Sequence, residues 1–330
     1  MTASLAGIFA SSDRNDFVHI DVPLWAWGAV IAFIGVLLVF DILVLHRVAK
    51  VPTFKRALVE TLGWIAIGVG FGAIVWSAWG QAAAGEYYSG YLIELSLSID
   101  NVFVWSLLLT YFAVPREYQH RVLFWGVFGA VTLRAVFIFA GVALVNKFEF
   151  VLVVFGVFLL YSSIQILRHD DAHEVNAETS RVLRLVRRVV PSTDQYDGQK
   201  LFTHIDGVRL ATPLFAVLVL IETTDVLFAV DSVPAVLAVS REQFIVFTSN
   251  AFAILGLRSL YFLFAGLKDR FVYLQQGLAV ILAFVGVKMI LSHWFHISTA
   301  VSLAVIIAVL AVSMGASLLV GSRERAPTGR

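Results

Sequence analysis

The chain has 330 residues, of which 59% are hydrophobic and only 14% are charged. Soluble domains contain about 25% charged residues, so this composition excludes an ordinary soluble enzyme and indicates a membrane protein with several crossings. The net charge of +1 gives no reason to expect a nucleic-acid partner, and the absence of cysteine excludes disulfides, thiolate metal sites and a cysteine nucleophile.

Apolar runs long enough for one bilayer crossing recur along the whole chain. We predict nine crossings, at residues 24–45, 57–79, 89–113, 122–145, 149–167, 212–239, 244–266, 271–291 and 299–320. The loops on one side of this arrangement carry 18 Lys and Arg residues and those on the other side carry three. The positive-inside rule therefore predicts a multi-pass protein of the cell membrane with its N-terminus outside and its C-terminus in the cytoplasm.

Two of the predicted crossings contain carboxylates, each of which costs at least ~2.5–3.5 kcal/mol at the centre of a bilayer. The first contains "ELSLSIDNVFV" and the second contains "ETTDVLFAVDSVPAV". Their candidate metal ligands are Glu94, Asp100, Asn101, Glu222, Asp225, Asp231 and Ser232. All of these are hard oxygen donors, and the histidines lie in loops or near the ends of crossings. The set therefore favours Mn²⁺, Mg²⁺ or Ca²⁺ over copper or zinc, as a transported substrate rather than a resident cofactor.

The two acidic motifs belong to a predicted internal repeat. Aligning Glu94 with Asp225 also aligns Asp100 with Asp231, which we expect to be the central ligands, and the next crossings share "LRAVFIFAG" and "LRSLYFLFAG". Crossings 3–5 and 6–8 therefore form two three-helix units. Because three is odd, the units are inverted relative to each other, as in many secondary transporters.

The repeat divides the chain into six predicted segments. These are an extracytoplasmic N-terminus (1–23), the first two crossings (24–88), repeat 1 (89–167), a cytoplasmic loop with a basic amphipathic helix (168–211), repeat 2 (212–291), and the last crossing with its cytoplasmic tail (292–330). The fold class is therefore an all-α integral membrane protein with two inverted repeats.

Three basic residues also fall inside predicted crossings. We expect Arg134, Arg258 and Lys288 to balance the buried acids, although Lys288 also fits a snorkelling residue. A dication and two arginines leave one negative charge among the five acids, which a shared proton could neutralise. Glu222 is the expected proton carrier because the residue that aligns with it in the first repeat is not an acid.

Three local features add further expectations. A spacing of six residues puts the two acids of each motif about 120° apart on a continuous helix, so Pro234 is expected to unwind the sixth crossing beside Asp231. The Asp-Gly pair in "KLFTHIDGVRLATP" predicts a β-hairpin. Asp41 and Glu60 lie near predicted cytoplasmic ends, as interface residues or as part of an inner vestibule.

The motifs "ELSLSIDNVFV" and "ETTDVLFAVDSVPAV", with "FDILVLHR" and "GVKMI", resemble the TerC/Alx family of integral membrane proteins over about residues 20–322. The resemblance implies a link to tellurium-resistance operons and, for Alx-like members, to manganese efflux, in a group with LysE-type exporters. It also implies functional roles for all seven candidate ligands. An all-acidic site indicates that any effect on tellurium oxyanions is indirect.

The leading hypothesis is therefore a secondary transporter that exports a divalent cation, with the lipid bilayer and the metal ion as its partners. A metal sensor or scaffold for membrane proteins of the same operon is the first alternative. An intramembrane aspartyl protease is the second, but such enzymes carry a GxGD motif, which is absent, and no Tyr-Asp pair lies in a predicted crossing. The chain has no P-loop motif, and we expect it not to be an enzyme.

Overall fold

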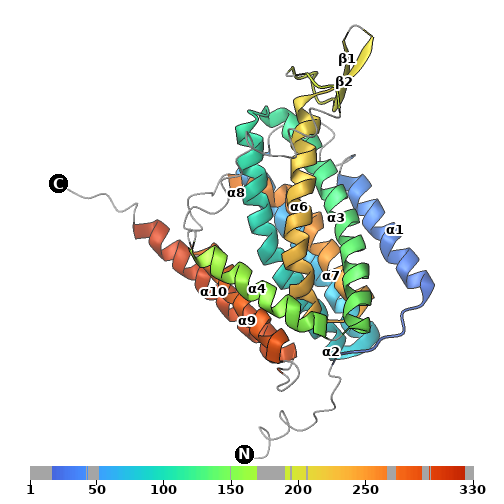
Figure 1. Cartoon of the computed structure of the whole chain (residues 1–330), viewed down its shortest axis with the longest axis vertical. Helices are drawn as coiled ribbons and strands as arrows, with labels where there is room; N and C mark the ends of the chain where they lie inside the picture. The colour runs from blue at the N-terminus through green and yellow to red at the C-terminus, as the bar shows by residue number, and fades with distance from the viewer. Residues whose placement is uncertain are drawn as a thin grey trace, which may run out of the picture.

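The computed structural model describes residues 17–41, 43, 52–148, 150–168, 190–193, 195–205, 207–265, 273–291, 297 and 299–323. Its helices are α1 (Leu24–Phe40), α2 (Phe54–Tyr111), α3 (Arg116–Lys147), α4 (Phe150–Arg168), α6 (Pro213–Leu237), α7 (Gln243–Leu255), α8 (Leu257–Ala265), α9 (Leu274–Leu291) and α10 (Thr299–Arg323) (Figure 1). Two strands, β1 (Phe202–Ile205) and β2 (Val208–Ala211), complete the described elements.

The expected all-α membrane architecture is confirmed. Four described helices, α2, α3, α4 and α6, are long and apolar enough to cross a membrane, and the bent pair α7–α8 makes a fifth. Shorter apolar helices cover Leu24–Phe40, Gln276–Leu291 and Val301–Ser317. Many large apolar side chains on these helices are exposed, as they are in a protein surrounded by lipid. The count of nine crossings stays a prediction.

Helix α2 contains a reversal of direction at Gly80. This glycine has φ 88° and ψ −178°, a conformation that needs a residue without Cβ. The hydroxyl of Tyr87 then donates to the carbonyl oxygen of Gly68 at 2.8 Å, and that of Tyr88 donates to Val69 at 2.9 Å. The two halves of α2 therefore lie side by side and antiparallel, over the ranges of the second and third predicted crossings.

Helix α6 corrects the expectation that Pro234 unwinds the chain beside Asp231. The helix runs without a break from Pro213 to Leu237, with Pro234 inside it. Pro234 lies in the last turn, so it removes one backbone hydrogen bond close to a helix end, and it is buried among neighbouring helices that stabilise this turn. The second predicted repeat bends elsewhere, by 41° between α7 and α8.

The packing of the helices is reciprocal between the two predicted repeats. Helix α3 packs on α6 while α2 packs on α7 and α8, and α4 packs on α9. Gly156 and Gly286 face each other where α4 crosses α9, since a Cβ on either one would lie 2.8 Å from the other's carbonyl oxygen. Contacts that recur with the partners exchanged are those that a two-fold relation produces. The inverted repeat remains a prediction, and this packing supports it.

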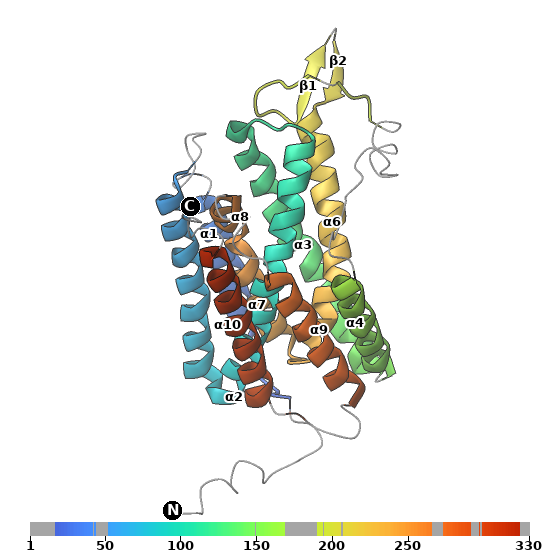
Figure 2. The same cartoon turned by 90° about the vertical axis from the view of Figure 1, so that its left-hand side faces the viewer.

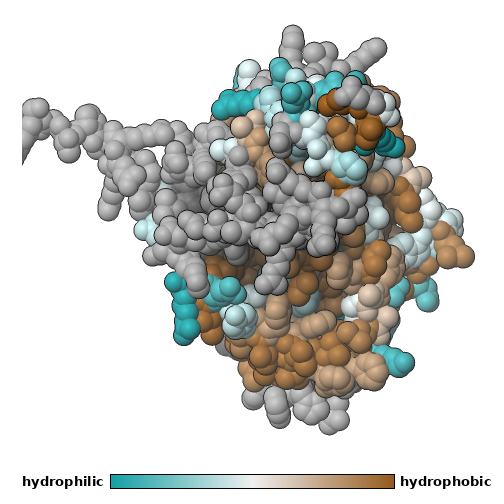
Figure 3. Space-filling view, turned by 45° about the horizontal axis from the view of Figure 1, so that its top comes forward, coloured by the Kyte–Doolittle hydropathy of each residue, from teal (hydrophilic) through white to brown (hydrophobic). Residues whose placement is uncertain are grey.

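The predicted β-hairpin is confirmed. Strands β1 and β2 pair antiparallel, with Phe202 opposite Ala211 and Gly207 at φ 79° in the turn. The hairpin extends beyond the start of α6, at the end of the molecule opposite to the reversal in α2 (Figure 2). Hydrophilic side chains gather at the hairpin end in Figure 3, and hydrophobic side chains cover much of the surface further along. The amphipathic helix expected within 168–211 lies outside the described residues.

Candidate functional site

A fully buried arginine lies at the centre of the helical bundle. Arg134 is on α3, in the middle of the predicted crossing 122–145, and its side chain is 0% exposed. Its Nε and Nη2 donate to the two carboxylate oxygens of Asp225 at 3.4 and 3.1 Å. Its Nη1 donates to Oγ of Ser232 at 3.1 Å and forms an ion pair with Glu94. All three guanidinium nitrogens are therefore engaged.

Two amide side chains complete this arrangement. With its amide oxygen turned towards Arg134, Asn101 accepts from Nη2 at 2.8 Å and donates to the carbonyl oxygen of Leu97 at 3.2 Å. Asn250, on α7, donates from Nδ2 to Glu94 at 2.7 Å. We call this set the Arg134 cluster: Glu94, Asn101, Arg134, Asp225, Ser232 and Asn250. Its members come from α2, α3, α6 and α7.

Helical spacing explains which residues of the two acidic motifs reach Arg134. On α2, Glu94, Ser98 and Asn101 are four and three residues apart, so they share one face. On α6, Asp225 and Ser232 are seven residues apart and share a face in the same way. The repeat alignment pairs Glu94 with Asp225 and Asn101 with Ser232, so corresponding faces of α2 and α6 contact the same guanidinium.

Asp231, the last acid of the second motif, contacts a different helix from the one that carries Arg134. Asp231 accepts a hydrogen bond of 2.8 Å from the hydroxyl of Ser162 on α4, because on a continuous α6 it points about 120° away from Asp225. The side chain of Asp100 lies outside the described residues. Asp100 and Asp231 as joint central ligands therefore stay a prediction, and the structure places Asp231 against a different helix from the Arg134 cluster.

Glu222 lies beside the Arg134 cluster, one turn before Asp225 on α6. Its carboxyl group packs directly against Gly129 of α3, where a Cβ would overlap it. One of its oxygens is buried and accepts no hydrogen bond from the described residues. Glu222 is thus a carboxylate close to the cluster that is not engaged by the arginine.

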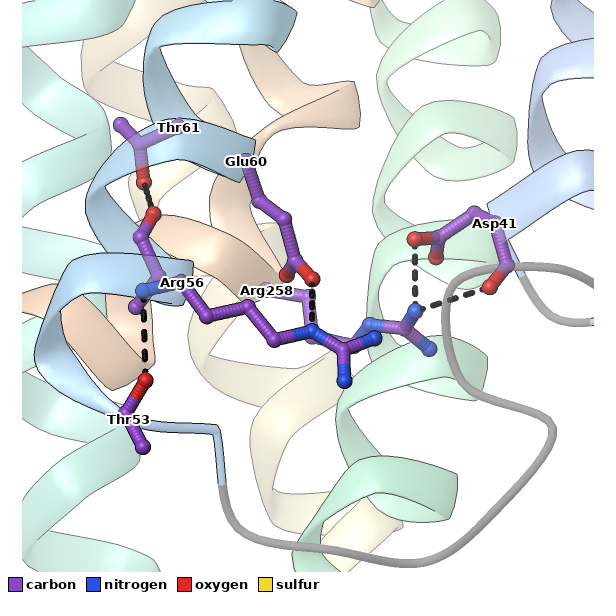
Figure 4. Close-up of polar contacts among 7 residues, drawn as sticks. Asp41, Thr53, Arg56, Glu60, Thr61 and Arg258 are labelled. Carbon is purple, nitrogen blue, oxygen red and sulfur yellow. Dashed lines mark hydrogen bonds and ion pairs between the residues drawn. The ribbon is translucent and has the colours of Figure 1, made fainter.

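Arg258 forms a different ion pair from the one that the repeat predicts. Its Nη2 donates to the carboxylate and to the backbone oxygen of Asp41, at 2.5 and 3.2 Å (Figure 4). Nearby, Nε of Arg56 donates to Glu60 at 2.8 Å. Arg258 thus balances a buried acid at the end of α1, and the expectation that it neutralises the acids of the two motifs stays a prediction.

Lys288 also lies apart from the Arg134 cluster. Its Nζ donates to the hydroxyl of Ser302 on α10 at 2.9 Å. A buried carboxylate that sequence reasoning missed, Glu86, accepts from the backbone N–H of Val18 at 2.8 Å and from the hydroxyl of Ser240 at 2.6 Å. An acid inside the apolar run "AAAGEYYSGY" was the available signal for it, but it preceded the start predicted for the third crossing.

The described residues contain no group of three or more His, Cys, Asp or Glu side chains arranged to hold a metal ion. A cavity of about 320 Å³ lies between the segment from Phe17 to Val22 and the start of α7, and none of the predicted site residues lines it. In this conformation Glu94 and Asp225 share one guanidinium, which offsets one of their two negative charges. The Arg134 cluster can therefore hold a cation, and the cation that it holds here belongs to the protein.

Comparisons with known proteins agree with this membrane architecture. The model of the integral membrane protein TerC family matches residues 79–325. The "Uncharacterized membrane protein STKORF319" of Myxococcus xanthus is 44% identical over 302 residues, which cover 92% of this chain and 94% of the relative. The "Putative membrane-bound redox modulator Alx" of Escherichia coli (strain K12) is 42% identical over 297 residues, covering 87% and 92%. No solved structure matches significantly. The chain belongs to the TerC family of integral membrane proteins.

Proposed function

We propose that this protein is a secondary transporter that exports a divalent metal cation, with Mn²⁺ as the first candidate, through the Arg134 cluster. The observation that carries the proposal is the meeting of Glu94 and Asp225, from two different helices, on one buried guanidinium. A chain places two carboxylates and an arginine inside a membrane at considerable cost, and such groups mark ion pathways. The proposed setting is the cell membrane, with the N-terminus outside.

The chemistry of the Arg134 cluster supports a hard cation. Besides the two carboxylates, Asn101 and Ser232 present oxygen atoms, and the chain has no cysteine. Oxygen ligands suit Mn²⁺, Mg²⁺ and Ca²⁺, whereas an oxyanion would be repelled by the two carboxylates. The reciprocal packing of the predicted repeats supports alternating access to a site at their interface. A proton carried by Glu222 is the coupling ion that we propose.

Two further candidate functions remain separable by experiment. The name of the E. coli relative describes a redox modulator, but the thiols through which proteins commonly act in redox exchange are absent here, since the chain has no cysteine. A sensor or scaffold would bind the cation without moving it. Both alternatives predict no net flux of metal through the purified protein.

Flux measured in proteoliposomes tests the proposal. The purified full chain should move Mn²⁺ down an imposed gradient, and Asp225→Asn should strongly reduce that movement. Asp197→Asn is the matched control, because Asp197 is an exposed loop carboxylate that pairs with Lys200 and should leave the flux intact. Wild-type vesicles no more permeable than empty ones would contradict transport, and binding without flux would favour the sensor.

A further inference from the structure

We propose that the guanidinium of Arg134 is a built-in competitor that occupies the place of the transported cation, so that a dication binds only when Arg134 leaves. This inference rests on the proposed function and adds how the site is regulated. In the described conformation the protein itself supplies the positive charge that faces Glu94 and Asp225.

The first argument is that the guanidinium uses the same oxygens that a metal would need. Arg134 engages the carboxylates of Glu94 and Asp225, the amide oxygen of Asn101 and the hydroxyl of Ser232. These are four of the seven ligands predicted from the sequence. A dication and a guanidinium cannot share them, because two cations a few ångströms apart repel strongly in a medium of low dielectric constant.

The second argument is that Arg134 cannot be removed by losing a proton. An arginine side chain stays protonated in proteins, so its charge leaves the oxygens only if the side chain moves.

The Arg134 cluster also has a neighbouring oxygen that could bind a metal ion and that the guanidinium does not use. Ser98 is fully buried on the same face of α2 as Glu94 and Asn101, and its hydroxyl has no hydrogen-bond partner among the described residues.

The third argument is that a second carboxylate is available to receive the displaced arginine. Glu222 lies one turn from Asp225, with one buried oxygen that accepts no hydrogen bond from the described residues. Its carboxyl group packs against α3, the helix that carries Arg134, at Gly129, where the lack of a side chain makes room for it.

Equilibrium binding of Mn²⁺ to the purified full chain tests this inference without measuring transport. Free Mn²⁺ can be counted by electron paramagnetic resonance during a titration. Arg134→Ala should bind Mn²⁺ at least tenfold more tightly than the wild type. Guanidinium ion at millimolar concentration should then compete with Mn²⁺ in Arg134→Ala and have no effect on the wild type. Arg258→Ala is the matched control, a buried arginine with a carboxylate partner elsewhere, and should show neither change.

Arg134→Lys provides a second variant if the alanine variant does not fold. Lysine keeps the charge but cannot bridge both carboxylates as the planar guanidinium does, so its Mn²⁺ affinity should lie between those of wild type and Arg134→Ala. If the variants that fold bind Mn²⁺ no more tightly than a wild type that transports it, the competitor role is wrong and the transport proposal stands. A wild type with neither binding nor flux contradicts both.

Discussion

Arg134 and Arg258 occupy corresponding positions in the two predicted repeats, yet the structure gives them different partners. Arg134 is held between Glu94 and Asp225 at the centre of the bundle. Arg258 is held by Asp41, at the end of α1, a helix that lies outside both repeats. Two similar sequences therefore place one cation at the centre of the helical bundle and the other beside the end of α1.

This difference shows how two similar sequence motifs can come to lie in different surroundings. Helix α3 is continuous, so Arg134 stays level with the acids of α2 and α6. The matching helix is divided into α7 and α8 by a bend of 41°, and Arg258 follows the bend. In transporters built from inverted repeats, alternating access is largely a rocking of one repeat against the other around a fixed site.

The largest expected effect is a difference in protein stability between alanine variants of the two arginines. Arg134→Ala leaves two buried carboxylates without their shared cation, so it should lower the free energy of unfolding by ~3–5 kcal/mol. Arg258→Ala should cost less, because it removes the partner of one carboxylate close to the end of a helix. Thermal unfolding in detergent measures both, and added Mn²⁺ should recover part of the loss in Arg134→Ala alone. Equal losses without such recovery would contradict the distinction between the two sites.

The next effect concerns the acids that face each arginine. Removing one member of a buried charge pair costs roughly 2–5 kcal/mol, so Asp225→Asn should weaken Mn²⁺ flux by about 100-fold or more. Asp41→Asn should reduce flux by less than about tenfold, because Asp41 holds Arg258 and not the transported ion. Initial rates of Mn²⁺ uptake into proteoliposomes provide the comparison. A larger loss in Asp41→Asn would move the cation site to the end of α1.

A smaller effect is expected at Asn250, which orients Glu94 through a hydrogen bond of 2.7 Å. A hydrogen bond to a charged group contributes about 1.5–3 kcal/mol, so Asn250→Ala should destabilise the protein by that order. It should also weaken Mn²⁺ binding, because Glu94 loses its fixed orientation. Ser162→Ala is the control, since Ser162 contacts Asp231 instead, and calorimetric titration with Mn²⁺ should show little change for it.

The last prediction concerns the side of the membrane that the end with the Arg258–Asp41 pair faces. The cysteine substitutions that test it should leave stability and flux unchanged. Because the chain has no cysteine, single cysteines at Ser192 and Ser292 can be labelled without background. The positive-inside rule places the first in the cytoplasm and the second outside. Impermeant maleimide should therefore label only the second in intact cells. Labelling of both from outside would disprove the predicted orientation.

The sequence by itself determined the class of the protein and most members of its candidate site. Apolar runs identify a membrane protein, and the Asp-Gly turn identifies the β-hairpin, because both signals are local. Charged residues inside such runs are rare and costly, so Glu94, Asp225 and Arg134 could be selected without a structure. Glu86 and Asn250 were missed, because the first preceded a predicted crossing and the second carries no charge.

Only the tertiary structure decided which of these groups meet. The directions of side chains depend on whether a helix is continuous, and α6 stays helical through Pro234, so Asp225 faces α3 while Asp231 faces α4. The partner of Arg258 depends on the bend between α7 and α8 and on the placement of α1. Helix rotation and bending are set by packing between segments far apart in the chain, and no local sequence pattern encodes that packing.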